Sequence, residues 1–301
     1  MKRQSQNLPN KLYKKAFTLV EFAIVITIIS LLIAVVSNSR ILINKAKSQK
    51  AQIETKTAPI LNITNDKGNI SAKLWLEASD PNSYTILSDN VVEIWHDKSP
   101  YGNDVTNGTN TTYLPTIATN AINDRGGALY FDGNDRLFSD GMVPLAFGDD
   151  QYSIVAVWQA DLLSVQVIWE QNSSQSGSGV VLYARGSLIT NAIGSYGFAG
   201  QFSDNATISP YEANVPYTSI LVKDDLAIDL YHLGALTSDT IPLDTSLYTE
   251  RHSVGSVASK GGEYFTGYIA EIIVFDKILT SSELELIHSY LFAKYGLKRD
   301  L

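Results

Sequence analysis

The sequence predicts a long transmembrane α-helix at the N-terminus, followed by an all-β sandwich that carries one helix at its C-terminal end. An apolar run over residues 17–36 has the length of a membrane span. Beyond residue 72, short runs rich in Val, Ile, Tyr, Phe and Trp alternate with Gly, Asn, Asp, Ser and Pro clusters, which is typical of an antiparallel β-sandwich. Near the end of the chain, four apolar residues recur at helical spacing: Leu284, Ile287, Leu291 and Tyr295.

Residues 1–16 form a basic leader ahead of the apolar run. The leader has no acidic residue, and its basic residues are Lys2, Arg3, Lys11, Lys14 and Lys15. Such a segment stays in the cytoplasm and directs the following chain across the membrane. The 20 residues of the run, at about 1.5 Å each, span about 30 Å, the thickness of a hydrocarbon core. The alternatives are a cleaved secretory signal, whose apolar region is usually about 7–15 residues, and an uncleaved anchor.

The junction between leader and span reads Ala16, then Phe17-Thr18-Leu19-Val20-Glu21. This pattern resembles a type IV pilin-like precursor, a prepilin or pseudopilin, in which a small residue precedes Phe-Thr-Leu-(Ile/Val)-Glu at the start of a long apolar helix. The resemblance implies that a prepilin peptidase cuts between Ala16 and Phe17 and methylates the new amine of Phe17. Ala16 stands where the family more usually has Gly.

Glu21 is the acidic residue of the predicted span. A charged side chain at the bilayer centre costs roughly 2.5–3.5 kcal/mol on insertion scales, so an acid there needs a partner. By resemblance, Glu21 would neutralise the Phe17 amine of a neighbouring subunit in a helical bundle, which turns two costly charges into a pair. The alternative is that Glu21 lies near the membrane interface and reaches water.

The helix is predicted to continue to residue 57 in amphipathic form. Apolar positions such as Ile41, Ala46 and Ile53 alternate with Lys, Arg and Gln, and Pro59 ends the segment. This part either packs on the globular domain or along a filament, or it is a solvated stalk. A polar stretch, residues 58–71, is predicted to be a linker.

Composition bounds the remaining possibilities. The 301 residues suffice for one anchor and one domain of about 230 residues. The chain contains no Cys and therefore no disulfide, including the C-terminal disulfide loop that many pilins carry. The net charge is −8, and loss of the five leader cations would leave 18 basic against 31 acidic residues, a charge near −13. No nucleic-acid partner is expected, because phosphate binding needs a basic patch.

Ten strands and a capped helix are predicted after residue 72. The strands are Lys73–Glu77, Val91–His96, Gly127–Asp132, Tyr152–Gln159, Val165–Glu170, Gly179–Arg185, Ser195–Phe202, Tyr217–Lys223, Ala227–Leu233 and Thr266–Asp276. The run at Tyr152–Gln159 is apolar on both sides and is therefore expected to be central, whereas Asp224-Asp225 is expected at a hairpin tip. Thr280 and Glu283 predict a capping box, and Gly296 predicts the end of the helix.

The region 72–297 resembles the concanavalin A-like, laminin G-like jelly-roll domain. The segments that carry the resemblance are Leu74–Asp80, Trp95–Ser99 with Gly102–Asp104, Ala128–Asp135 and Gly267–Phe275, followed by the capped helix. They imply a scaffold and do not specify a ligand, since function depends on sites grafted on folds.

Signals for catalysis are weak. A glycan hydrolase of this fold needs two carboxylates facing one cleft, and no Glu-x-Asp-x-Glu pattern occurs on a predicted strand. Glu271 is surrounded by apolar residues, and the resemblance to the laminin G-like pattern implies that it is a buried hydrogen-bonding residue. The histidines show no metal or nucleophile spacing (His96, His232, His252 and His288), and His288 is expected to be a partly exposed helical residue. No catalytic residue is therefore predicted, and the chain is expected not to be an enzyme.

Two kinds of binding site are possible in the loops. Asp132, Asn134 and Asp135 could contribute oxygen ligands to calcium, as could Asp97, Asp104 and Asp149-Asp150, although turn chemistry explains the same residues. Sugar binding needs exposed aromatic residues near polar loops, and six tyrosines lie in such segments: Tyr101, Tyr113, Tyr211, Tyr217, Tyr248 and Tyr264.

These features predict a pilin-like subunit of the bacterial inner membrane, a minor pilin or pseudopilin, with its head outside the cytoplasm or on a surface filament. Its expected partners are a prepilin peptidase, other pilin-like subunits and a glycan or protein ligand for adhesion. The alternatives are a secretion-system pseudopilin that recognises an exported substrate and a membrane-tethered glycan hydrolase or lyase.

Overall fold

The computed structural model describes residues 18–139, 151–172, 179–186, 191–196, 211–224, 227–232, 235–240, 252–257 and 262–297. The chain divides into two compact units, Met1–Lys45 and Ala46–Leu301. The predicted N-terminal helix is confirmed as α1 (Leu19–Lys56), whose end from Ala46 onward belongs to the same unit as the β-domain, here called the head.

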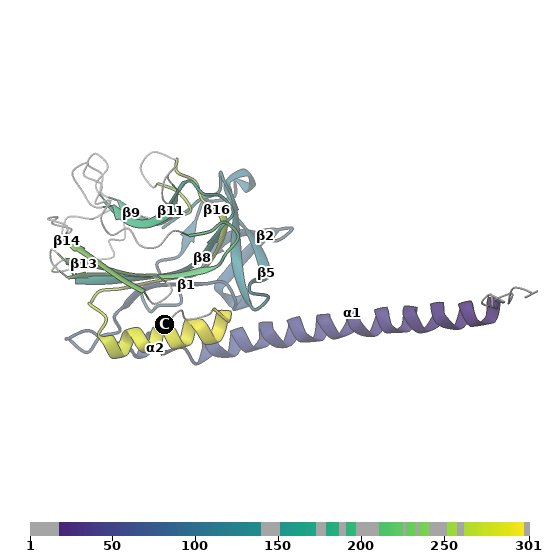
Figure 1. Cartoon of the computed structure of the whole chain (residues 1–301). Coiled ribbons are helices and arrows are strands. Elements are labelled where there is room, and N and C mark those ends of the chain that lie inside the picture. Colours follow the sequence, from purple (N-terminus) through teal and green to yellow (C-terminus); the bar gives the residue numbers. More distant parts are fainter. Residues whose placement is uncertain are drawn as a thin grey trace, which may run out of the picture. The chain divides into compact units, whose positions relative to one another are not determined.

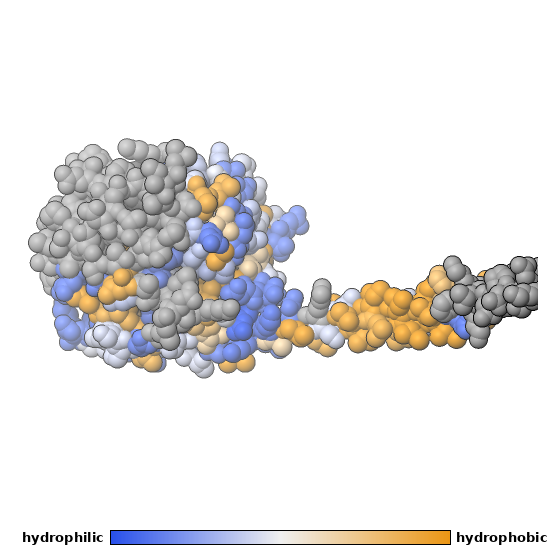
Figure 2. All heavy atoms as spheres, viewed as in Figure 1, coloured by the Kyte–Doolittle hydropathy of each residue, from blue (hydrophilic) through white to orange (hydrophobic). Residues whose placement is uncertain are grey.

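The N-terminal part of α1 presents apolar side chains on all its sides. In the described part of the chain, one helix is long and apolar enough to cross a membrane, and it begins at Leu19. Figure 2 shows the hydrophobic surface along this part of α1. Leu31, Leu32 and Ile33 are each about 60% exposed. An apolar surface of this size needs lipid or other helices around it.

The described residues of the head contain the following elements. The strands are β1 (Ala72–Glu77), β2 (Tyr84–Ser88), β3 (Val91–Trp95), β4 (Val105–Thr106), β5 (Thr116–Ile122), β6 (Gly126–Asp132), β7 (Leu137–Ser139), β8 (Gln151–Ala160), β9 (Val165–Asn172), β10 (Gly179–Gly186), β11 (Asn191–Tyr196), β12 (Tyr217–Asp224), β13 (Ala227–His232), β14 (Ala235–Thr240), β15 (His252–Val254) and β16 (Thr266–Phe275). The helical elements are η1 (Pro59–Asn62), η2 (Pro81–Ser83), η3 (Thr111–Tyr113) and α2 (Ser281–Tyr295).

The strands pair antiparallel throughout and form one hydrogen-bonded sheet, in the order β11-β10-β9-β15-β7-β4-β3-β5-β6-β16-β8-β12-β13-β14, with β1 on β16 and β2 on β3. The sheet folds over into two layers, and α2 lies against the layer that contains β1 and β8 (Figure 1). This arrangement is the predicted sandwich with a C-terminal helix.

The described residues of the head form two main hydrophobic cores. The first contains Trp95, Trp158 and Trp169, and the second joins the sheet to α2 through residues such as Ile273 and Ile287. Strand β8 serves both cores, because successive side chains on a strand point to opposite faces. Its even-numbered residues from Ile154 to Trp158 pack in the first core, while Val155 and Val157 pack in the second. The predicted central position of this strand is confirmed, since β8 lies between β16 and β12.

Helix α2 begins and ends where its sequence predicts. The Thr280 hydroxyl accepts the Glu283 amide at 3.3 Å, and the Glu283 carboxylate accepts the Thr280 amide at 2.8 Å. At the other end, Gly296 has φ +65° and donates its amide to the Phe292 carbonyl at 2.9 Å. A residue with a Cβ is strained at this φ, which is why glycine ends the helix.

Residues 58–71 pack on the head, whereas the sequence predicts a linker there. Ile60 is fully buried and Ile63 is 4% exposed, and both belong to the second core. The Ser71 amide donates to the Ile63 carbonyl at 2.9 Å, which closes the segment on itself. Ala58 and Ile70 also pack against this core, so apolar side chains along a largely polar stretch attach it to the domain.

Several strands differ from their predicted limits or are not predicted. Strands β2, β4, β5, β7, β14 and β15 are not predicted. Three of them are only two to three residues long (β4, β7 and β15), and the other three mix polar with apolar residues. Strand β11 (Asn191–Tyr196) begins four residues before the predicted Ser195–Phe202, whose part from 197 lies outside the described residues. The β12–β13 hairpin is present with Asp224 opposite Ala227, although Asp225 also lies outside the described residues.

Candidate functional site

Glu21 lies in the first turn of α1, and its carboxylate caps the helix. Its Oε2 accepts the Thr18 amide and the Thr18 hydroxyl, each at 2.8 Å, and the Glu21 amide donates to the Thr18 hydroxyl at 3.2 Å. Thr18-x-x-Glu21 is thus a capping box, a role that the pattern Thr-x-x-Glu could have indicated. Ala16 and Phe17, the predicted cleavage and methylation sites, lie outside the described residues.

Asp132, Asn134 and Asp135 form a tight turn after β6. The Asp132 amide donates to Asp135 Oδ2 at 2.9 Å, and the Asn134 amide donates to Asp132 Oδ1 at 3.1 Å. Gly133 has φ +97°, which the turn requires. Asp135 is 4% exposed, and its burial raises the pKa of the carboxyl to about 7. The described residues hold no group of three or more His, Cys, Asp or Glu that could bind a metal. The hydrogen bonds of residues 132–135 are those of a turn.

The other predicted acidic ligands also stabilise loops. Asp97 accepts the amides of Trp75, Ser99 and Asn103, each at 2.8 Å. Asp104 accepts the Asp97 amide at 2.8 Å and pairs with His96 at 2.8 Å. Asp149 and Asp150 lie outside the described residues.

The tyrosines of the predicted sugar-binding segments have different fates. Tyr211 and Tyr217 pack against Trp158 in the first core, so their predicted exposure is wrong. Tyr101 is 43% exposed beneath the Lys73 ammonium, and Tyr248 lies outside the described residues. Tyr113 and Tyr264 come together from separate loops, with the Arg136 guanidinium 4.7 Å and 5.8 Å from their ring centroids.

The histidines do not converge. His232 and His252 are buried, and burial lowers their pKa values to about 4 and about 3. His288 is 3% exposed and packs near Tyr231 and Phe292, which corrects the prediction of a partly exposed residue. It faces the second core, because Tyr231 and Phe292 both pack against that core.

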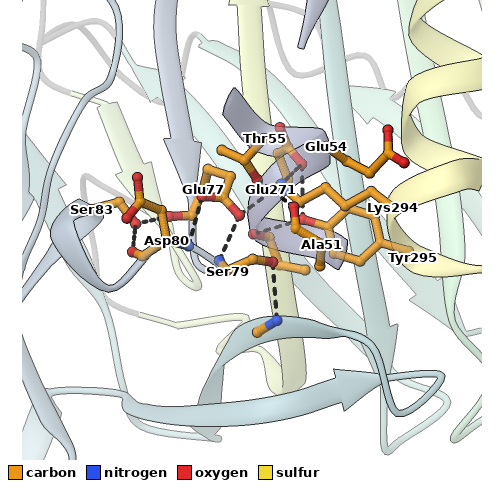
Figure 3. A network of polar contacts seen from close by, with 12 residues as sticks. Ala51, Glu54, Thr55, Glu77, Ser79, Asp80, Ser83, Glu271, Lys294 and Tyr295 are labelled. Carbon is orange, nitrogen blue, oxygen red and sulfur yellow. Dashed lines mark hydrogen bonds and ion pairs between the residues drawn. The ribbon is translucent and has the colours of Figure 1, made fainter. Parts of the chain in front are cut away.

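A fully buried ion-pair network lies beneath α2 (Figure 3). Lys294 Nζ is 2.7 Å from Glu77 Oε1 and 2.9 Å from Glu271 Oε2, and the three side chains have no exposed surface. Glu271 also accepts hydrogen bonds from Trp75 Nε1 at 2.7 Å and from the hydroxyls of Tyr290 and Tyr295 at 2.8 Å. The predicted buried hydrogen-bonding role of Glu271 is thus what the structure contains. A hydrolytic carboxylate pair must face a substrate cleft, which Glu77 and Glu271 do not.

A β-bulge positions Glu271. The pairing of β16 with β8 shifts register between Ile269 and Glu271, so Ala270 is the extra residue. Glu271 consequently lies on the same side as Ile273 and Phe275, toward α2. Strand β6 also lies very close to the chain just after β1, because a Cβ at Gly127 would collide with the Ala78 carbonyl oxygen. The Gly126-Gly127 pair is the sequence signal for this contact.

The end of α1 closes the same network. Ala51 is fully buried and Thr55 is 3% exposed, and Figure 3 shows both beside the side chains of Glu77 and Lys294. Lys47 adds a surface ion pair with Asp124 at 3.6 Å. Among the possibilities that the sequence leaves open for this segment, the structure has the helix end packed on the head.

A surface pocket of ≈ 430 Å³ lies next to the end of α1 and is lined by residues that include Trp75, His96 and Lys98. Its volume is within the range of small-molecule sites. Its charged groups are already paired, Lys98 with Asp80 at 2.7 Å and His96 with Asp104 at 2.8 Å. These pairs leave the pocket little capacity to attract a charged ligand.

Comparison with known proteins identifies the N-terminus. Residues 11–37 match the family model described as the prokaryotic N-terminal methylation motif. The chain carries a prepilin-type N-terminus. The match covers the end of the leader, the Ala16–Phe17 junction and the apolar run, and it implies processing by a prepilin peptidase and assembly with other pilin subunits. No curated protein matches the chain in sequence.

The head is similar in structure to domains of glycan-processing enzymes. Domain 4 of AbnA, a GH43 extracellular arabinanase from Geobacillus stearothermophilus solved with arabinotriose, aligns with a TM-score of 0.52 and 16% identity over 72% of this chain and 98% of that domain. A GH54 α-L-arabinofuranosidase aligns with a TM-score of 0.53 and 13% identity over 68% of this chain and 51% of that one. Trypanosoma rangeli sialidase in complex with sialic acid gives 0.50 and 14%, over 85% and 39%. At these identities the similarity shows the fold alone.

Replacing Lys294 tests how much the buried network stabilises the head. Lys294→Met leaves Glu77 and Glu271 buried without their cation, which we expect to lower the free energy of unfolding by about 3–5 kcal/mol. Lys277→Met is the matched control, because Lys277 forms a partly exposed pair with Glu283 worth about 0–1 kcal/mol. Urea unfolding of the detergent-solubilised chain, followed by tryptophan fluorescence, measures both. Equal losses in the two variants would contradict a stabilising role for the network.

Replacing Asp135 separates the turn from calcium binding. The folded-state pKa of about 7 lies above the ordinary pKa of an aspartic acid, so the stability contributed by protonated Asp135 is lost as pH rises toward and through 7. Asn keeps an acceptor for the Asp132 amide without a charge, so Asp135→Asn should raise Tm at pH 8 and lose this advantage near pH 4.

The control for this pair of measurements is Asp66→Asn, which changes an exposed acid. Melting is recorded by calorimetry with calcium and with chelator. If calcium binds at this turn, Asp135→Asn will instead lower Tm in calcium, and chelator will remove the difference.

Proposed function

We propose that this chain is a pilin-like subunit, a minor pilin or a pseudopilin, that displays its jelly-roll head for adhesion to a glycan or a protein. The observation that carries the proposal is one continuous helix, α1, which begins with the methylation motif and ends packed on the head. Before assembly the chain would reside in the inner membrane with the head outside the cytoplasm. After assembly the head would project from a filament.

The exposed apolar surface of α1 supports this proposal. A surface of this kind is stable in a bilayer and also in a bundle of like helices, so the same helix can move from membrane to filament. Cleavage before Phe17 would add a positive amine at the end of the helix, and Glu21 of a neighbouring subunit would neutralise it. Within its own chain, Glu21 is hydrogen-bonded to Thr18 and has no cationic partner among the described residues.

The packed end of α1 suits a displayed head. Ala51 and Thr55 are buried against the head, and residues 58–71 add Ile60 and Ile63 to its core. A pull on this end of the helix would act on a folded interface rather than on a flexible tether.

Two alternatives share parts of this evidence. A secretion-system pseudopilin would use the same helix, with the head recognising an exported substrate. A membrane-tethered glycan hydrolase or lyase draws support from the similarity of the head to Domain 4 of the arabinanase, which was solved with arabinotriose. Release of reducing ends from a polysaccharide by the intact chain would favour the hydrolase, and unsaturated products would favour the lyase.

The proposal is tested by the mature N-terminus and by Glu21→Gln. Mass spectrometry of the chain from cells with its prepilin peptidase and companion subunits should give N-methylated Phe17 as the first residue. Glu21→Gln preserves an acceptor for Thr18 but removes the charge. We expect cleavage to persist and incorporation into sheared filaments to fall by about tenfold or more.

Thr18→Val is the matched control, since it removes the capping hydroxyl and keeps the carboxylate. Its incorporation should stay within about twofold of the wild type, because losing a cap costs about 1 kcal/mol of helix stability. An intact leader, or a first residue after Ser39, would overturn the pilin-like role. Equal loss in Thr18→Val and Glu21→Gln would show that helix capping, and not the charge, is what assembly needs.

A further inference from the structure

Arg136 differs from four lysines of the head in its charge partners. Lys73, Lys98, Lys277 and Lys294 each have a carboxylate oxygen within 3.0 Å. Arg136 has no carboxylate within ion-pair distance among the described residues. Its Nη1 donates to the Tyr264 hydroxyl at 2.6 Å, and its buried Nε has no hydrogen-bond partner. A guanidinium has five donors, so most of this one's capacity is unused by the described chain.

Three loops hold Arg136 in place. It follows the Asp132–Asp135 turn, and its amide donates to the Tyr113 carbonyl at 3.1 Å at the end of η3. Tyr264 comes from the segment that leads into β16. The ring centroids of Tyr113, Tyr264 and Phe138 lie 4.7, 5.8 and 5.9 Å from the guanidinium carbon. All four side chains are partly exposed, so the cluster can be reached from solvent.

We propose that Arg136, with Tyr113, Phe138 and Tyr264, binds a sugar residue that carries a carboxylate, as part of an acidic glycan. The proposal rests on the binding role proposed for the head and names its ligand class. A carboxylate accepts two parallel hydrogen bonds from the planar fork of an arginine, a geometry that a lysine does not provide. The aromatic rings supply apolar surface for the face of a sugar ring, and a site that combines such rings with one well-placed charge is typical for small ligands.

The surrounding charge sets the expected strength. The whole chain has a net charge of −8, and Asp132 is exposed on the same turn, so a polyanion gains little from long-range attraction. Binding therefore depends on the local contact with Arg136 and is expected to weaken as salt increases. An acidic peptide would offer the same carboxylate without the sugar ring, and the experiment distinguishes the two.

The test measures binding of tri-galacturonate to the full chain in detergent by titration calorimetry. Galactotriose is the neutral control ligand and tri-glutamate is the peptide control. We expect tri-galacturonate to bind about tenfold or more tighter than either, because a hydrogen-bonded charge pair and a stacked ring act together. Arg136→Gln should weaken it about tenfold or more, Arg136→Lys should give an intermediate loss, and Lys67→Gln, the same charge change at an exposed site, should have no effect.

The outcomes separate the site from the proposed function. If Arg136→Gln has a lower Tm than the wild type, its loss of binding could reflect unfolding. Binding of tri-galacturonate is then judged from Arg136→Lys, which keeps the charge, and from Tyr264→Phe, which keeps the ring. Unchanged binding in all Arg136 variants overturns the site, and equal Arg136-dependent binding of tri-glutamate overturns the sugar. A glycan bound without Arg136 leaves the adhesive role intact and refutes this inference. A failed N-terminal processing test leaves the sugar result standing and refutes the pilin-like role.

Discussion

The ion-pair network around Lys294 is the constraint on which the head depends. Its three charged side chains come from β1, β16 and α2 and are fully buried. Two carboxylates face one ammonium, and donors from Trp75, Tyr290 and Tyr295 offset the surplus negative charge. A buried pair stabilises a fold only if such further hydrogen bonds satisfy it. The network can therefore form only when the sheet register, the bulge at Ala270 and the docking of α2 are all correct.

The acidic residues near the two ends of α1 differ in the partners that the chain gives them. In the head, the chain provides Lys294 for Glu77 and Glu271, and the helix end with Ala51 and Thr55 closes over them. At the start of α1, the described chain provides Glu21 only with hydrogen bonds from Thr18. In the head, the buried carboxylates thus have a cation and hydrogen-bond donors from the same chain. At the start of α1, Glu21 has no cationic partner among the described residues, which is a condition that assembly with a second chain would satisfy.

The elements that could be predicted from the sequence are those with a local signal. The apolar run of α1, the capping box of Thr280 and Glu283, and the doubly apolar β8 each lie within a short stretch of sequence. Strands β4, β7 and β15 have two or three residues and exist because partners distant in sequence hold them. The burial of Ile60 and Ile63 also has no local signal in the sequence, because the segment around them is largely polar.

The same distinction applies to the sites. The methylation motif is contiguous, whereas Tyr113, Arg136 and Tyr264 come from three loops whose convergence no spacing indicates. Six tyrosines met the criterion of lying near polar loops, and folding placed Tyr211 and Tyr217 in the core. The evidence for the Arg136 cluster exists only in three dimensions: three aromatic rings surround a guanidinium that has no carboxylate partner among the described residues, whereas Lys73, Lys98, Lys277 and Lys294 each have one. A jelly-roll scaffold does not determine its ligand. The partly exposed Arg136 guanidinium, whose hydrogen-bond donors are mostly unused by the described chain, is therefore better evidence for the ligand than the fold itself.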